Sequence, residues 1–329
     1  MIIKIAFSFC LLLTTAATCA QKTKRPVAVI FDSDMGPDYD DVGAITLLHA
    51  FADSGYIKIL ATVASTKYEG VAAVLNVFNT YFKRPDLPIA VPKGRALDLR
   101  DRQHWTDTLL KNYPHRIKEN NEVPGAVEVY RQLLSIQPDT SVTIITVGFL
   151  TNLSDLLSSL PDKYSTLDGK SLVKRKVKQL VCMAGRFPSG SEFNVNQDAA
   201  ASQFVFDNWE TPILFSGVEI GFKITTGLRL IRNVAIKNSP VKDVFRICIP
   251  LSAQDSAGRM SWDQTAVLVA VKGYTPWYRV EKGKIIVAAD RSNRWSNESL
   301  THEYLKEAQS PAIVRRVIDS LMMHQPLKK

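Results

Sequence analysis

The chain has 329 residues, of which 46% are hydrophobic, 22% are charged and four are cysteine. This composition excludes a disordered chain, a collagen-like fibre and a small disulfide-stabilised scaffold, and it supplies enough apolar residues for a sizeable core. The formal net charge is +9, but the densest basic run, 170–178, lies directly before an apolar segment. A nucleic-acid groove needs basic residues interleaved with aromatic ones, so we expect no nucleic-acid partner.

The first twenty residues are typical of a cleaved secretory signal. Lys4 precedes an apolar run at 5–13, and small residues at 18–20 precede Gln21. About nine apolar residues are too few to span a bilayer, and no other segment is long enough, so we expect a secreted or periplasmic protein without membrane insertion. Cys19 could instead carry a lipid anchor, although Ala16 stands three residues before it, where leucine is usual.

From residue 24 onward, short apolar runs alternate with segments of helical periodicity. Runs typical of buried strands lie at 27–31, 57–64, 142–147, 177–184 and 213–215, and helical spacing lies at 42–52, 70–83, 150–160, 197–209 and 310–324. Two late runs, 277–280 and 284–288, with a turn at 282–283, predict a hairpin. The alternation predicts one α/β domain over residues 21–329, doubly wound, with a mainly parallel mixed sheet and a Rossmann-like core.

Two irregular zones and two cysteines complete this outline. The zones 92–124 and 225–260 are too long for simple connections and too rich in apolar residues for linkers. We therefore expect them to form loops and helices that cover a site. Cys182 and Cys248 remain after cleavage, each flanked by apolar residues, which favours buried free thiols, with a single disulfide as the alternative in an exported chain.

An acidic cluster follows the first predicted strand and precedes the first predicted helix. It contains five carboxylates in ten residues: Asp32, Asp34, Asp38, Asp40 and Asp41. Clustered carboxylates repel one another unless a cation neutralises them, and oxygen ligands on a bent loop suit Ca²⁺ or Mg²⁺. A solvated turn whose aspartates cap a helix is the plainer alternative, but Asp32 and Asp34 continue the strand, where caps have no role.

Further polar motifs follow other predicted strands. They are Gly148-Phe149-Leu150-Thr151-Asn152 after Val147, Met183-Ala184-Gly185, Glu192-Phe193-Asn194, and Ser261-Trp262-Asp263 at the start of an apolar helix. Each has a structural explanation when taken alone, such as a turn, a packed methionine or a helix cap. Because ligands of open α/β sheets bind beyond the carboxyl ends of the strands, we expect these motifs to converge there.

In this order the motifs resemble the calcium-dependent nucleoside hydrolases of the inosine-uridine preferring type. The family opens with Asp-x-Asp, a glycine-containing turn and Asp-Asp before an apolar helix, matched here by Asp32, Asp34, Gly36, Asp40 and Asp41. The resemblance implies that a nucleoside is cleaved to free base and ribose, and that the protein forms a homo-oligomer, a dimer or a tetramer. It covers almost the whole chain after the predicted signal.

The resemblance also implies a role for each matched residue. Ca²⁺ would be held by Asp34, Asp41, the carbonyl oxygen of Val147 and Asp263. Sugar hydroxyls would be bound by Asp40 beside the metal and by Met183, Glu192 and Asn194 on the far side. Asp34 would also be the catalytic base that receives a proton from the attacking water.

Two positions depart from the family pattern. Ser65-Thr66 stands where the family usually has Gly-Asn, so Thr66 offers the sugar a hydroxyl but no amide. Trp262 stands before Asp263, where many members carry a histidine that protonates the leaving base, and an indole cannot serve as that acid. The purine-specific branch of the family has tryptophan there and stacks the base on it, so we expect a purine substrate sandwiched by Trp262 and Trp105.

The remaining features leave two alternatives open. None of the five histidines is predicted to act as the acid, since His49 lies within a helix and His104 and His115 are typical of solvated loops. The start Asp32-Ser33-Asp34 also resembles haloacid-dehalogenase-type phosphatases, which would leave the Asp40-Asp41 pair unexplained. The other alternative is a secreted homologue that binds nucleosides or sugars without turnover.

Overall fold

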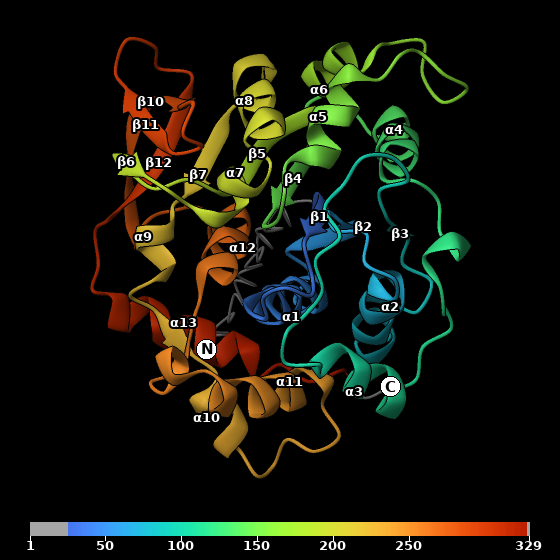
Figure 1. Ribbon diagram of the computed structural model, residues 1–329, viewed down its shortest axis with the longest axis vertical. Helices are drawn as coiled ribbons and strands as arrows, with labels where there is room; N and C mark the ends of the chain where they lie inside the picture. The colour runs from blue at the N-terminus through green and yellow to red at the C-terminus, as the bar shows by residue number, and fades with distance from the viewer. Residues whose placement is uncertain (1–25, 328–329) are drawn as a thin grey trace, which may run out of the picture.

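The computed structural model describes residues 26–327, so the predicted signal at 1–20 lies outside the described residues. Its framework is a sheet of ten strands in the order β3-β2-β1-β4-β5-β7-β12-β10-β11-β6 (Figure 1). Its strands are β1 (Val27–Ser33), β2 (Ile57–Ala64), β3 (Ile89–Ala90), β4 (Val142–Thr146), β5 (Val177–Met183), β6 (Ser189–Gly190), β7 (Ile213–Ser216), β10 (Tyr278–Val287), β11 (Asn293–Ser296) and β12 (His302–Glu307). A separate two-stranded sheet pairs β8 (Thr225–Thr226) with β9 (Arg259–Met260).

The strands from β3 to β12 in this order are parallel, whereas β10, β11 and β6 add antiparallel pairs at one side. The mainly parallel mixed sheet predicted from the sequence is therefore confirmed. β1 is hydrogen-bonded to β2 on one side and to β4 on the other. The chain thus proceeds from β1 outward in one direction and later returns to build the other half, which creates a crevice beyond the carboxyl ends of β1 and β4.

Helices cover both faces of the sheet and bury two apolar clusters. One face is covered by α1 (Asp40–Asp53), α2 (Val71–Tyr81), α11 (Pro240–Cys248), α12 (Trp262–Lys272) and α13 (Pro311–Met322). The other face is covered by α4 (Ala126–Ile136), α5 (Thr151–Ser158), α6 (Gly169–Lys176) and α8 (Ala199–Asn208). Short helices complete the chain: α3 (Trp105–Asn112), α7 (Phe193–Gln197), α9 (Val218–Gly221) and α10 (Leu228–Arg232).

Local sequence signals explain where several helices begin. α11 and α13 both start with proline, whose missing N–H costs nothing at the first helical position. The preceding serines, Ser239 and Ser310, accept hydrogen bonds from backbone N–H groups of the first turn. Among residues 26–327, no helix is both long and apolar enough to cross a membrane.

The predicted hairpin at 277–288 is wrong. β10 runs without interruption through residues 282 and 283, pairing with β12 along its first half and with β11 along its second half. Gly283 is required for packing and not for a turn, because a Cβ at this position would lie 2.1 Å from Nε1 of Trp295. The glycine in the sequence indicated a turn, but the reason for a glycine here is the close approach of an indole from a neighbouring strand.

Both irregular zones contribute to a cavity beside the acidic loop, as expected of segments that cover a site: Arg100 and Gln103 come from the first zone, and Gln254 and Arg259 from the second. The first zone contributes α3 and the second contributes α10 and α11, and α3 packs on α11. The expectation for the cysteines is also confirmed, since Cys182 and Cys248 are buried free thiols. Burial raises the pKa of the Cys182 thiol well above its usual range, so this residue is an inert core group.

Candidate active site

A cavity of about 230 Å³ lies where β1, β4 and β5 end. Nine of the residues predicted from the sequence line it: Asp34, Asp40, Asp41, Val147, Met183, Glu192, Asn194, Trp262 and Asp263. Five others line it as well: Asp38, Phe193, Val218, Gln254 and Arg259. The structure therefore brings together residues of the acidic cluster, Val147 and the motifs at 183–185, 192–194 and 261–263, whereas none of residues 148–152 lines the cavity.

The bend between β1 and α1 directs the acidic residues into the cavity. The hydroxyl of Ser33 accepts a hydrogen bond from the backbone N–H of Met35 at 3.0 Å and donates to Oδ1 of Asp41 at 2.5 Å. These two bonds close the turn after β1 and fix Asp41 in the first turn of α1. Asp34 remains on the cavity wall between them.

Three carboxylates form a compact group at the base of the cavity. Oxygen atoms of Asp40, Asp41 and Asp263 all lie within 4.8 Å of one another, and all three residues are buried. Burial raises the pKa of Asp41 to about 7, and burial together with the neighbouring carboxylates raises the pKa of Asp263 well above its usual range. The protein thus holds these groups in a state that is costly without a compensating positive charge.

The donor set fits a divalent cation. Oδ2 of Asp41 is buried and has no hydrogen-bond partner, so it is free to serve as a ligand. Oxygen-only donors suit hard cations such as calcium and magnesium. Asp34 lines the same cavity outside the compact group, and the carbonyl of Val147 accepts a hydrogen bond from Nδ2 of Asn194 at 3.0 Å.

Asp40 has more partners than its expected role in sugar binding requires. Its Oδ2 accepts hydrogen bonds from the backbone N–H groups of Trp262 at 3.1 Å and Asp263 at 3.2 Å, at the start of α12. Its Oδ1 accepts from Arg259, with 3.2 Å to Nη2. Asp40 therefore joins the start of α1 to the start of α12, and this fixes the position of Asp263.

Arg259 is the principal site residue that sequence reasoning missed. It is a buried arginine that pairs with Asp38 and Asp40, with Asp255 3.6 Å away, and its guanidinium lies over the Trp262 ring. Burial would lower the pKa of the guanidinium, but the neighbouring carboxylates outweigh it and hold the pKa above its usual range. The sequence does contain one indication of this residue. The loop at 38–41 carries three carboxylates and no basic residue, so a positively charged side chain from elsewhere in the chain is needed to balance them.

The opposite wall of the cavity is built by Glu192 and Asn194. The carboxylate of Glu192 accepts hydrogen bonds from the backbone N–H groups of Asn194 at 2.8 Å and Gly185 at 3.0 Å, and it caps α7. Nδ2 of Asn194 also donates to the carbonyl of Met183 at 3.1 Å. These bonds preorganise the wall, and burial raises the pKa of Glu192.

Two predicted substrate-binding residues do not line the cavity. Thr66 is fully buried and its hydroxyl is committed to the backbone of Leu97 and Leu99, so it anchors the first irregular zone. Trp105, the first residue of α3, is fully buried in the apolar cluster with α2 and α11. Among residues 26–327, Trp262 is therefore the only tryptophan that lines the cavity.

The structure also shows where the histidines and Asp32 lie. None of the five histidines, all of which belong to residues 26–327, lines this cavity. Asp32 is fully buried away from it and accepts hydrogen bonds from the Tyr130 hydroxyl at 2.8 Å and from Asn152 at 3.0 Å. A phosphatase nucleophile must reach its substrate, so this geometry argues against the phosphatase alternative.

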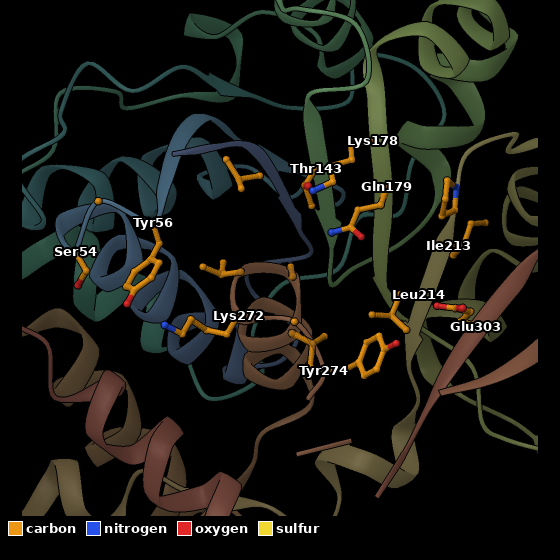
Figure 2. A pocket seen from close by; sticks show the side chains of 17 residues that line it. Ser54, Tyr56, Thr143, Lys178, Gln179, Ile213, Leu214, Lys272, Tyr274 and Glu303 are labelled. Carbon is orange, nitrogen blue, oxygen red and sulfur yellow. The ribbon is translucent and has the colours of Figure 1, made fainter. Parts of the chain in front are cut away.

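A larger cavity, of about 1020 Å³, lies at the other edge of the sheet. Figure 2 shows side chains that line it, among them Tyr56, Thr143, Lys178 and Lys272. Thr143 and Lys178 stand near the starts of β4 and β5, so the cavity lies at the amino ends of the strands. Ligands of open α/β sheets bind at the carboxyl ends, which favours the smaller acidic cavity as the active site.

A family model and solved structures match most of the chain. The family model described as "Inosine-uridine preferring nucleoside hydrolase" matches residues 29–314. The pyrimidine-specific ribonucleoside hydrolase RihA of Salmonella enteritidis PT4 is 29% identical over 209 residues, which is 59% of this chain. The match spans 61% of RihA, so the chain covers about three fifths of the curated relatives it matches.

Solved structures show the same fold at low sequence identity. An inosine-uridine preferring nucleoside hydrolase from Bacillus anthracis aligns with 90% of this chain and 99% of its own, with a TM-score of 0.67 and 14% identity. A purine-preferring ribonucleoside hydrolase from Gardnerella vaginalis aligns over the same shares, with a TM-score of 0.68 and 14% identity. These likenesses establish the architecture of the chain.

Proposed function

Because the chain belongs to the inosine-uridine preferring nucleoside hydrolase family, we propose that it hydrolyses the N-glycosidic bond of ribonucleosides to free base and ribose. The observation that carries this proposal is the group of buried carboxylates around the orphaned Oδ2 of Asp41, in a cavity at the carboxyl ends of the strands. Such a site binds a cation and a polyhydroxylated ligand together.

The residues of the cavity have complementary tasks in this reaction. Asp34 accepts a proton from the attacking water, whose oxygen forms a bond to the anomeric carbon of the ribose. The bond from that carbon to the base nitrogen breaks, and its electron pair leaves with the base. Positive charge that develops on the sugar ring is stabilised by the surrounding carboxylates.

We propose calcium as the metal, held by Asp34, Asp41, Asp263 and the carbonyl of Val147. The cation would supply positive charge that neutralises the carboxylates and acidifies a water. For Val147 to contribute, its carbonyl must use its second lone pair, because Asn194 already donates to it. Oxygen-only donors on a bent loop support calcium, which tolerates irregular coordination better than magnesium does.

We propose a purine preference on the basis of Trp262 alone. Its half-buried indole lines the cavity, and its Nε1 donates to the carbonyl of Val218 at 2.8 Å, which fixes the ring. A fixed aromatic ring offers stacking area to a large base. Trp105 contributes nothing to this preference, since it lies in the core.

The decisive experiment is base release from inosine, adenosine, guanosine and uridine, with calcium and then with a chelator. Release that the chelator abolishes and calcium restores supports the reaction and the metal, and faster release from the purine nucleosides supports the preference. A protein that releases no base from any of the four in the presence of calcium is not a ribonucleoside hydrolase.

A second candidate is a binding protein without turnover. Two observations favour it: Asp40 is already bonded to Arg259, and none of the described histidines lines the cavity to serve as an acid. Calorimetric titration with inosine in the presence of calcium distinguishes the two, because this candidate gives saturable binding with no free base.

We also propose that the protein is exported and forms a dimer or a tetramer. The charged start, apolar run and small residues within 1–20 support export, and the family resemblance supports the oligomer. Cell fractionation tests the first statement, and light scattering on the purified protein tests the second. A cytoplasmic full-length chain or a monomer would contradict them.

A further inference from the structure

Arg259 stands at the boundary between two compartments of the active-site cleft. The inner cavity of about 230 Å³ holds the carboxylate group, and an outer compartment of about 450 Å³ lies beside it. Asp38, Phe193, Gln254 and Arg259 line both, so they form the passage between the two. A ligand in the inner cavity that is larger than this space would therefore have to pass Arg259 to reach the outer compartment.

The guanidinium of Arg259 is held rigidly at this boundary. Its central carbon lies 4.9 Å from the ring centroid of Tyr39 and 4.9 Å from that of Trp262. Nη2 lies 3.2 Å from Oδ1 of Asp40, and the Tyr39 hydroxyl donates to Asp255 at 2.8 Å beside it. With only 5% of its side chain exposed, Arg259 is a preorganised positive charge.

Arg259 donates a hydrogen bond to Asp40, the carboxylate that the family resemblance assigns to sugar binding. When a sugar hydroxyl next to the anomeric carbon binds Asp40, the bond between that carbon and the base therefore lies close to the guanidinium. A guanidinium keeps its proton at all ordinary pH values and cannot act as an acid. It can, however, stabilise negative charge that develops on a departing group.

We propose that Arg259 stabilises the leaving base, in place of an acid that protonates it. As the bond between the anomeric carbon and the base nitrogen breaks, the electron pair stays on the base, which departs as an anion beside the guanidinium and later takes a proton from solvent. The proton of the attacking water is held by Asp34 and is released to solvent when the ribose leaves. This inference rests on the proposed hydrolysis and adds to it the means of expelling the base.

Asp38 allows a second test of the inference. It belongs to the turn at 36–39, its side chain is 37% exposed, and it pairs with Arg259 from the solvent side. Asp38 neutralises part of the charge that Arg259 offers to a leaving group. Removing this carboxylate while retaining the arginine therefore strengthens the positive charge at the boundary.

The test compares two substrates that differ only in the leaving group. Inosine needs help to expel its base, whereas 4-nitrophenyl riboside releases a stabilised anion unaided. We expect Arg259→Gln to lower kcat/KM for inosine by about 100-fold and for 4-nitrophenyl riboside by less than about 10-fold, with Arg259→Lys between wild type and Gln. The matched control is Arg246→Gln, an exposed arginine on α11, which leaves both values unchanged.

The other possible results of this comparison also decide whether the inference holds. Equal losses on both substrates make Arg259 a purely structural residue and overturn the inference while the proposed function stands. If Arg259→Gln does not fold, Asp38→Asn replaces it, and the inference requires a rise of at least about 3-fold in the inosine rate relative to 4-nitrophenyl riboside. A wild-type protein that cleaves neither substrate overturns both the inference and the proposed function.

Discussion

Gly148 and Asp34 touch across the ends of β4 and β1, with no room for a side chain between them. A Cβ at Gly148 would lie 2.4 Å from the backbone nitrogen of Asp34 and 2.3 Å from Oγ of Ser65. The hydroxyl of Ser65 in turn accepts the backbone N–H of Phe149 at 3.1 Å. The turn after β4 and the proposed catalytic base are therefore positioned by the same contact.

We expect Gly148→Ala to displace Asp34. The added methyl group meets backbone atoms that cannot rotate away, so the variant should lose about 1–3 kcal/mol of stability and about 100-fold in kcat/KM for inosine. Thermal unfolding and base release measure the two effects. Gly94→Ala is the control, because Gly94 is exposed and a Cβ there meets nothing within 4 Å. Equal behaviour of the two variants would contradict the role of this contact.

We expect Asp41→Asn to stabilise the protein without calcium and to abolish the stabilisation by calcium. The substitution removes a buried charge from a group of mutually repelling carboxylates, and it also removes a metal ligand. Differential scanning calorimetry with chelator and with calcium checks both parts. Asp86→Asn, at a side chain that is 83% exposed, should keep the calcium-induced rise in Tm of the wild type. A calcium shift that survives in Asp41→Asn would exclude Asp41 as a ligand.

Trp105 and Trp262 should respond differently to replacement by phenylalanine. Trp105 is fully buried in the apolar core, so Trp105→Phe should cost about 1–2 kcal/mol of stability and leave the ratio of inosine to uridine turnover unchanged. Trp262 lines the cavity, so Trp262→Phe should lower that ratio by reducing the stacking area. Measurement of the inosine-to-uridine ratio in both variants tests these different roles. A changed ratio in Trp105→Phe would indicate that Trp105 contacts the substrate.

His49 should make the protein sensitive to acid. Burial, and secondly Arg84, lower the pKa of this imidazole to about 3, and it contacts Oδ1 of Asn79 at 3.1 Å. The unfolded chain takes up a proton on this residue at about pH 6.5, whereas the folded chain does so only near pH 3. The contribution of His49 to the free energy of unfolding therefore falls by about 1.4 kcal/mol per pH unit as the pH drops from about 6 to 4.

His49→Gln removes this contribution while it keeps a polar group near Asn79. Chemical unfolding between pH 4 and 7 should show a slope that is smaller in this variant than in the wild type by about that amount. Other groups still contribute to the slope: burial lowers the pKa of His302 to about 4, which adds to it, and burial raises the pKa of Asp41 to about 7, which opposes it. His104→Gln, at a side chain that is 71% exposed, should retain the slope of the wild type. Parallel curves for His49→Gln and wild type would exclude the effect.

Much of the framework could be predicted because its signals are local. β2 was predicted at its observed bounds, since an apolar run between turn residues is sufficient to identify a buried strand. β1 extends two residues beyond its prediction, because Asp32 and Ser33 are polar and still belong to the sheet. Their burial depends on Tyr130 and Asn152, which donate to Asp32, and on the Asp41 carboxylate, which accepts from Ser33. No local pattern contains those partners.

The strand-ending motifs, and with them the acidic edge of the sheet, are evident in the sequence, because each motif is contiguous and parallel strands bring their ends together. Which polar and aromatic residues line the cavity depends instead on how the chain packs. Trp105 lies in the core, and Thr66 anchors a loop. Arg259 binds Asp40 although it lies 219 residues further along the chain. Pairing of a buried charge depends on distance in space, which a linear pattern does not encode.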